Sequence, residues 1–254
     1  MSEILQTSIP YDPFAPERLP GIQPLPLAEW LAFDEAFAAQ MAERARLVEN
    51  ARERVIYLSD GARPAALELL DHVLEARYGG AREGVVTRPD GVEVAIDRNG
   101  VMGTLSRLVQ QDLCLLERPE GAQEHVLTGA VLCFPASWTL AQKAGKPLLA
   151  IHKPVRAYDA GLAARVQRLF DGVQAGRPLW RFNALWYADA TLHQPRVEED
   201  PRPTSTPETQ RYLRSELQSL YRLPESRAVV FGIHTRVLAR RDVLAQWGRE
   251  NASQ

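Results

Sequence analysis

Two stretches of this chain alternate large apolar and polar side chains at every second residue, and this pattern constrains the fold more than any other feature. In residues 179–187 one face carries Trp180, Phe182, Ala184 and Trp186, and the other carries Arg181, Asn183, Leu185 and Tyr187. Residues 228–237 alternate in a similar way. A period of two residues is typical of a β-strand. The first stretch therefore predicts a strand that is buried on one side and contacts something polar on the other.

Helices are predicted elsewhere by apolar residues at three- and four-residue intervals. This periodicity covers residues 27–49, 64–78 and 162–173, and Gly79-Gly80 is expected to end the second helix. We expect further helices over residues 104–116 and 240–247. Another is expected from Thr206 to about Tyr221, because a capping hydroxyl, a proline and an acidic residue stand at its start.

The remaining elements complete an α+β fold. Residues 85–97 predict a hairpin around Pro89-Asp90-Gly91, and residues 128–134 predict a buried strand. Prolines recur through residues 1–26, so this segment is expected to be an extended Pro-rich N-terminal arm. Residues 27–248 are then expected to form a single domain with a mainly antiparallel sheet and surrounding helices.

Composition excludes several classes of function. The 254 residues carry a formal net charge of −2, which gives no general attraction to nucleic acid or to an anionic membrane. Cys114 and Cys133 form no Cys-x-x-Cys pair, so a disulfide framework or a structural zinc site is not expected. The chain has no glycine-rich nucleotide fingerprint and no apolar run near the roughly 20 residues that span a bilayer. We therefore expect a cytoplasmic globular protein without a signal peptide.

The segment from Gly129 to Val155 places one histidine in an unusual setting. His152 stands between Ile151 and the Lys153-Pro154 step, and a proline biases the residue before it away from the helical region. An imidazole fixed beside apolar side chains can reach a metal centre from an apolar wall. The alternative is a hydrogen-bonded histidine with a purely structural role.

Ordered motifs across most of the chain carry a family resemblance. Residues 134–138 (Phe-Pro-Ala-Ser-Trp), 143–148 (Lys-Ala-Gly-Lys-Pro-Leu) and 151–155 (Ile-His-Lys-Pro-Val) come first. Residues 180–183, 193–195, 214–224 and 229–233 follow in order. In this set the chain resembles the heme-dependent oxidative N-demethylase α-subunit family, whose members include dimethylamine monooxygenase-like proteins. The resemblance implies a PAS-like heme-binding domain with helical additions.

The resemblance also implies roles for individual residues. His152 is the first choice as the metal ligand to a heme iron, and His234 is the alternative. Guanidinium groups pair well with propionate carboxylates, which makes Arg181, Arg214 and Arg222 candidates for cofactor binding. Asn183, two residues after Arg181 in the same motif, is a further candidate for cofactor binding. Glu216 matches a family glutamate and is the candidate catalytic residue, because a buried carboxylate can bind the ammonium group of an amine. The alternative for Glu216 is an exposed helix residue that pairs with Arg214 or Tyr212.

Two positions depart from the family pattern. His234 stands where relatives carry arginine, and His193 stands where they carry phenylalanine. His72 and His125 neighbour acidic residues and are expected on the solvated surface.

Two hypotheses about function follow from the resemblance. In the first, the chain is the heme-binding subunit of a monooxygenase-type oxidative N-demethylase, which uses O2 and a small secondary amine such as dimethylamine. Its electrons come from a separate flavin and iron–sulfur reductase, since the chain carries no motif for either group. In the second, it is a PAS-like heme or small-ligand sensor or carrier without catalytic activity.

Overall fold

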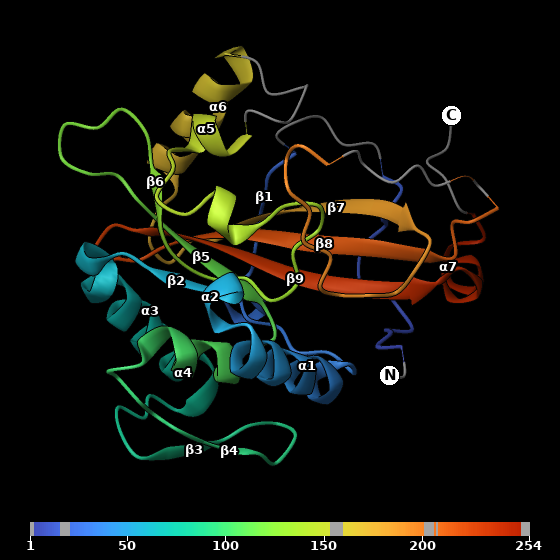
Figure 1. The fold of residues 1–254 in the computed structure, drawn as a ribbon, viewed down its shortest axis with the longest axis horizontal. Coiled ribbons are helices and arrows are strands. Elements are labelled where there is room, and N and C mark those ends of the chain that lie inside the picture. The colour runs from blue at the N-terminus through green and yellow to red at the C-terminus, as the bar shows by residue number, and fades with distance from the viewer. Residues whose placement is uncertain (1–2, 16–20, 153–159, 201–205, 207, 250–254) are drawn as a thin grey trace.

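The computed structural model describes residues 3–15, 21–152, 160–200, 206 and 208–249 (Figure 1). In these residues a seven-stranded sheet has the order β1-β7-β8-β9-β5-β6-β2, and every neighbouring pair is antiparallel. The strands are β1 Gln23–Pro24, β2 Ile56–Leu58, β5 Asp112–Glu117, β6 Val126–Val131, β7 Leu179–Tyr187, β8 Tyr212–Arg222 and β9 Val229–Ala239. A separate hairpin pairs β3 Val85–Thr87 with β4 Glu93–Ala95. The predicted α+β fold with a mainly antiparallel sheet is confirmed.

Helices cover the sheet on both faces, as Figure 1 shows with α1–α4 on one side and α5 and α6 on the other. The helices are α1 Phe37–Asn50, α2 Arg52–Val55, α3 Arg63–Tyr78, α4 Val101–Leu108, α5 Leu148–His152, α6 Ala160–Gly172 and α7 Arg240–Trp247. Short 3-10 helices are η1 Leu27–Glu29, η2 Asp60–Ala62 and η3 Leu140–Gln142. We call the two sides of the sheet the α3 face and the α6 face.

Each face has its own apolar cluster. On the α3 face, Leu70 of α3 and Leu105 of α4 pack in one cluster with Leu115 and Val230 of the central strands. On the α6 face, Leu148 of α5 and Phe170 of α6 share a cluster that contains the residues Cys114, Leu116, Leu220, Val229 and Ile233 of the sheet. Directly opposed residues of antiparallel strands point to the same side. The register of β7, β8 and β9 therefore assigns every residue of these strands to one face.

Several predicted elements are confirmed. The strands over residues 179–187 and 228–237 correspond to β7 and β9, and the hairpin is β3–β4. The helix over residues 64–78 is α3, and it ends at Gly79 in the left-handed conformation with φ 64°. The helices over residues 162–173 and 240–247 correspond to α6 and α7.

Three helix predictions were wrong over part or all of their length. The helix over residues 27–49 is confirmed only from Phe37, after the short turn η1. The helix over residues 104–116 ends at Leu108, and β5 begins at Asp112. Residues 212–222 form the strand β8 in place of the predicted helix. β8 lies between β7 and β9 and most of its residues are buried, so tertiary pairing overrides the helical propensity of its Arg, Glu and Gln residues.

Part of the Pro-rich N-terminal segment is integral to the described structure. Gln6 and Ile9 are both 0% exposed. The backbone N–H of Gln6 donates to the carbonyl of Val237, and the Gln6 side-chain oxygen accepts from the Val237 N–H. Ile9 packs with Leu213 and Leu238 at the end of the long strands. Gln23–Pro24 also adds a short edge strand to β7.

Candidate functional site

The first motif, residues 134–138, is held by two buried charged residues from the sheet. Asp112 accepts the backbone N–H groups of Cys133 and Phe134, both at 2.8 Å. Arg214 donates to the Phe134 carbonyl at 2.6 Å and to the Leu192 carbonyl at 2.9 Å. The predicted cofactor-binding residue Arg214 therefore joins two loops through their backbone carbonyls.

The loop after β7 pairs directly with this motif. The Gln194 N–H donates to the Pro135 carbonyl at 3.1 Å, and the Gln194 carbonyl accepts the Ser137 N–H at 3.0 Å. Ser137 is in the left-handed region with φ 65°, a conformation that is uncommon for a residue with a side chain. Two motifs that lie far apart in the sequence are thus one structural unit.

The motif at residues 143–148 positions α5. Lys143 is 4% exposed, and its ammonium group donates to the Ile151 carbonyl at 2.6 Å and pairs with Glu198 at 2.5 Å. Gly145 adopts φ 69°, and its N–H donates to the Leu127 carbonyl of β6. A buried ammonium group therefore holds the last turn of α5, directly before His152.

His152 is the last residue of α5 and is half-buried beside the α6-face cluster that contains Leu148 and Ile151. Its Nδ1 lies 2.9 Å from the Leu148 carbonyl. A carbonyl can only accept, so Nδ1 carries the ring proton and Nε2 keeps its lone pair. Burial lowers the pKa of His152, and the nearby Lys143 lowers it as well. The side chain is therefore a neutral, oriented imidazole, which is the form that binds a metal. The expectation that Lys153 is not helical lies outside the described residues.

A row of polar side chains crosses β7 and β8 on the α6 face. Arg181 donates to the Gln218 side-chain oxygen at 3.1 Å, and the Gln218 amide donates to Glu216 at 3.4 Å. Glu216 also accepts from Arg214 at 3.4 Å and is 8% exposed. Asn183 lies directly opposite Glu216 in the register. The structure thus brings Arg181, Asn183, Arg214 and Glu216 close together on this face, and Glu216 lies on a strand, not on a helix.

An unpaired hydroxyl borders this row. Thr235 of β9 is opposite Glu216 in the register, and its Oγ1 is buried without a hydrogen-bond partner among the described residues. A buried donor without a partner is costly, and it calls for a water molecule or a ligand group. The α6 face therefore combines an apolar cluster with a polar row that has unused hydrogen-bonding capacity.

Arg222 lies on the same face but at the other end of β8. It is 5% exposed, and its guanidinium donates to the carbonyls of Val173, Arg227 and Phe170. These contacts use most of its donors to join α6 to the β8–β9 turn.

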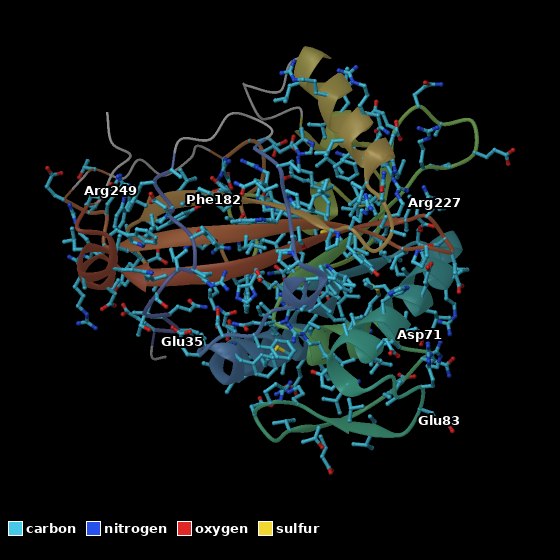
Figure 2. All side chains as sticks on the ribbon, turned by 180° about the vertical axis from the view of Figure 1, so that it is seen from behind. Glu35, Asp71, Glu83, Phe182, Arg227 and Arg249 are labelled. Atoms are coloured by element: carbon cyan, nitrogen blue, oxygen red, sulfur yellow. The ribbon has the colours of Figure 1, made fainter. Side chains whose placement is uncertain are left out.

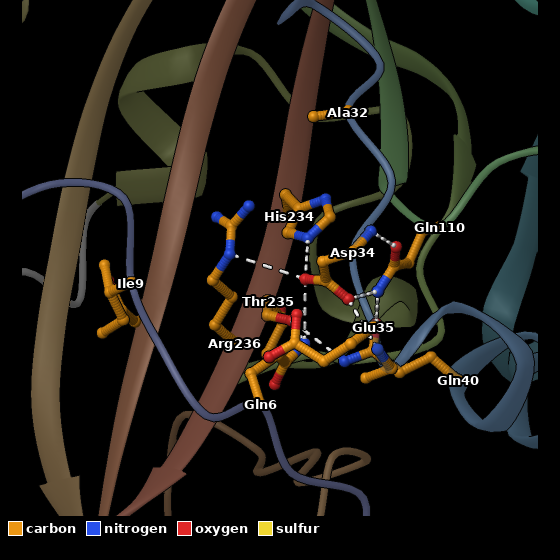
Figure 3. A network of polar contacts seen from close by, with 12 residues as sticks. Gln6, Ile9, Ala32, Asp34, Glu35, Gln40, Gln110, His234, Thr235 and Arg236 are labelled. Carbon is orange, nitrogen blue, oxygen red and sulfur yellow. Dashed lines mark hydrogen bonds and ion pairs between the residues drawn. The ribbon is translucent and has the colours of Figure 1, made fainter. Parts of the chain in front are cut away.

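His234 points to the opposite face of the sheet from the polar row. Its register partner is Leu217, whereas Glu216 pairs with Thr235. Figure 3 shows its ring directed at Asp34, where Nε2 lies 2.8 Å from the carboxylate. Gln110 also donates to Asp34 at 2.6 Å, and Arg236 approaches it to 3.5 Å. His234 and His152 therefore occupy different faces, and the structure does not bring them together.

Burial and charge set the protonation of this network. Burial raises the pKa of Asp34, but the bonds from His234 and Gln110 and the charge of Arg236 outweigh it, so the pKa is lowered overall. Burial and the charge of Arg236 lower the pKa of His234 against the opposing effect of Asp34. We therefore take His234 as neutral and Asp34 as ionised near neutral pH.

Replacing His234 by glutamine is expected to flatten the pH dependence of stability between pH 7 and 5. Because the folded pKa is lowered, the unfolded chain binds a proton that the folded chain does not, below a pKa of about 6.5. Stability of the natural chain therefore falls as the pH drops, by up to about 1.4 kcal/mol per pH unit for this group. Asp34 does not act in this window, since its lowered pKa affects stability only below about pH 4. Urea unfolding at several pH values measures the slope, and an unchanged slope in His234→Gln would contradict this account. His125 and His152, whose pKa values are also lowered, account for the slope that remains.

The structure changes the interpretation of two other histidines. His125 is 2% exposed, which contradicts the expected solvated position, because Gln167 of α6 bonds both its backbone and its ring. His193 binds the Cys133 carbonyl through Nδ1 at 2.8 Å, so its Nε2 also keeps a lone pair. His193 is thus a further possible metal ligand, which its position in the motif alone did not indicate.

The cysteines are less suitable as ligands. Both are free and buried. Burial raises the pKa of Cys133 to about 12 and raises that of Cys114 as well. Neither is a thiolate at neutral pH. In the described part of the chain, no three His, Cys, Asp or Glu side chains form a cluster that holds a metal ion without a cofactor.

A family model supports the resemblance independently. The model described as "Haem-dependent oxidative N-demethylase, alpha subunit-like" matches residues 21–251. The chain belongs to this family. The N-demethylase α-subunit-like family is heme-dependent, so its cofactor is heme, and its name describes an oxidoreductase component of a multi-subunit enzyme. Among the helices that the structure describes, none has the length and apolar character needed to cross a membrane.

The described residues suit the cofactor of the N-demethylase family. A heme needs an apolar wall, an axial donor and partners for two carboxylates. The α6 face supplies a large apolar cluster, a neutral imidazole fixed by a backbone carbonyl, and a polar row with arginines and an unpaired hydroxyl. The PAS-like character of the fold remains a prediction.

Proposed function

We propose that this chain is the heme-binding subunit of an O2-dependent oxidative N-demethylase that acts on a small secondary amine such as dimethylamine. The observation that carries the proposal is the imidazole of His152, which is neutral, has its Nδ1 proton on the Leu148 carbonyl and lies beside an apolar cluster. Membership of the N-demethylase family supports the reaction class.

In this proposal the bound heme supplies the oxygen-activating redox chemistry, and the protein supplies position, charge and exclusion of water. His152 would hold the iron through Nε2, and Lys143 would fix that imidazole by holding the last turn of α5. Arg181 and Asn183 would contact the cofactor carboxylates from β7. Burial lowers the pKa of His152 and keeps the ring neutral at neutral pH, which is the form that binds a metal.

Glu216 would bind the amine. A secondary amine is an ammonium ion near neutral pH, and a carboxylate is its natural partner. Glu216 is nearly buried, and in the described part of the chain its side chain accepts two long hydrogen bonds, at 3.4 Å each, which leaves acceptor capacity. Thr235 beside it offers a hydroxyl without a partner among the described residues.

The overall reaction requires electrons from outside this chain. With dimethylamine, one O2, two electrons and two protons give methylamine, formaldehyde and water. The sequence has no glycine-rich nucleotide fingerprint and no Cys-x-x-Cys motif. We therefore infer a separate reductase with flavin and an iron–sulfur cluster as the partner.

The test is formaldehyde release by the heme-loaded chain with its reductase and NADPH. We expect formaldehyde with dimethylamine, and Glu216→Gln is expected to lower kcat/KM by about 10- to 100-fold, because a charged hydrogen bond is lost. The loss should appear mainly as a higher KM if Glu216 binds the ammonium group. Glu83→Gln, at an exposed position, is the matched control and should leave the kinetics unchanged. Stable heme binding without turnover on a panel of secondary amines would contradict the enzyme and favour a sensor or carrier.

A further inference from the structure

A cavity lies at the end of the sheet that carries the β8–β9 turn, away from the polar row. Its volume is ≈ 810 Å³, and its lining includes Ser59, Arg118, His125, Asp171 and Arg227. These residues come from the start of η2, the ends of β5 and α6, the loop before β6, and the turn after β8. Arg227 lies at the periphery of the molecule in Figure 2.

His125 lines this cavity and carries a hydrogen-bond donor on its ring. Its backbone N–H donates to the Gln167 side-chain oxygen at 3.2 Å, which turns the Gln167 amide nitrogen toward the ring. That nitrogen donates to Nδ1 at 2.9 Å, so the ring proton of a neutral His125 is on Nε2. Burial lowers the pKa of His125, which keeps it neutral. Nε2 has no hydrogen-bond partner among the described residues, and the side chain lines the cavity.

Positive charge exceeds negative charge around this donor. Of the two lining carboxylates, Asp171 already accepts from Arg118 at 2.8 Å and from Gln167 at 3.0 Å, and Glu117 accepts from the Thr128 hydroxyl. The lining residue Arg222 is buried and donates to backbone carbonyls, with no carboxylate in an ion pair among the described residues.

Arg227 is the cation best placed to meet a ligand. It is exposed, and its side chain has no partner in the described part of the chain. Its backbone is in the left-handed region with φ 63°, where a residue with a side chain costs roughly 1 kcal/mol or more. The bond from Arg222 to the Arg227 carbonyl holds this turn in place.

We propose that this cavity binds a small oxyanion, a phosphate or a carboxylate group, between the Nε2–H of His125 and the guanidinium of Arg227. Both groups donate to anionic oxygens, and a guanidinium does so with two parallel bonds. The bound charge offsets the excess of arginine at this end of the sheet. The site is separate from the polar row of the α6 face and does not depend on the proposed function.

Calorimetric titration of the full chain with inorganic phosphate, and in parallel with formate, tests the site and separates the two kinds of anion. We expect saturable binding at one site per chain. Arg227→Asn is expected to weaken it by about tenfold or more, since asparagine tolerates the left-handed backbone but lacks the charge. Arg241→Asn removes the same charge at a position whose side chain is 84% exposed, and it should bind as the natural chain does.

A second measurement does not depend on any variant. The ring nitrogen resonances of His125 should move when phosphate is added to the natural chain, and both heme-free and heme-loaded protein should bind phosphate with similar affinity. The proposal is overturned if phosphate binding is not saturable, or if Arg227→Asn binds phosphate as tightly as the natural chain. It is also overturned if the ring nitrogen resonances of His125 do not move when phosphate is added. Loss of phosphate binding on heme loading would also overturn it, because the cavity would then belong to the cofactor.

Discussion

Replacing His152 by alanine is expected to weaken heme retention by about 100-fold or more and to change the absorption spectrum of what remains. Loss of a residue that merely orients a metal ligand costs 10- to 100-fold, so loss of the ligand itself should cost at least as much. The measurement is heme per chain after gel filtration, together with the Soret spectrum. His152→Gly with added imidazole should recover part of the natural spectrum.

His193→Ala and His234→Ala are the matched controls. Both histidines have a ring nitrogen bonded to an acceptor, as His152 does, but His234 lies on the α3 face and His193 in the loop after β7. We expect both variants to keep the natural heme spectrum. An unchanged heme content and spectrum in His152→Ala, with loss in one of the others, would transfer the ligand assignment to that histidine.

Replacing Asp112 by alanine is expected to destabilise the chain by about 3 to 5 kcal/mol. Asp112 and Arg44 are 1% and 0% exposed and form an ion pair at 2.5 Å. Removing the carboxylate leaves the Arg44 charge buried, and it also leaves the N–H groups of Cys133 and Phe134 without their acceptor. Urea unfolding measures the change in the free energy of unfolding.

Asp71→Ala is the control for this prediction. Asp71 pairs with Arg98 and Arg82, but its side chain is 26% exposed and its partners are more exposed still. Pairs in solvent contribute about 1 kcal/mol or less, so this variant should change little. The double variant Asp112→Leu with Arg44→Met should recover part of the lost stability, because no charge is left buried, whereas the N–H groups of Cys133 and Phe134 still lack their acceptor. Equal effects in Asp112→Ala and Asp71→Ala would contradict the account.

Local sequence patterns predicted the elements that are buried on one side and exposed on the other, or that end at a distinctive residue. The alternation in β7 is visible because that strand lies near the sheet edge, with only the two-residue β1 outside it. Gly79 marks the end of α3 because only glycine adopts the left-handed C-cap without cost. Such signals depend on neighbouring residues and do not require knowledge of the tertiary fold.

β8 shows where local patterns fail. Both of its edges pair with neighbouring strands, and consecutive residues along it are buried, so both faces are covered and no simple alternation of apolar and polar residues remains. Thr206 and Pro207 also resemble a helix start. Because of this error Glu216 was predicted on a helix, although it lies on a strand. The sequence pattern therefore did not predict that Glu216 lies opposite Asn183 and Thr235.

The candidate site was predictable from the motifs only as a set of residues. The sequence motifs indicated His152, Arg181, Asn183, Arg214 and Glu216, but not which of them share a face. The face of His234 depends on the β8–β9 register, and the buried position of His125 depends on α6. The anchoring roles of Asp112 and Lys143 were missed, since each acts on a segment more than five residues away in the chain.

A crystal structure of the heme-loaded chain tests the central claim most directly. The account predicts iron bonded to Nε2 of His152, with the porphyrin against the cluster on the α6 face and its carboxylates toward Arg181. Iron bonded to His193 or His234, or a porphyrin on the α3 face, would contradict it.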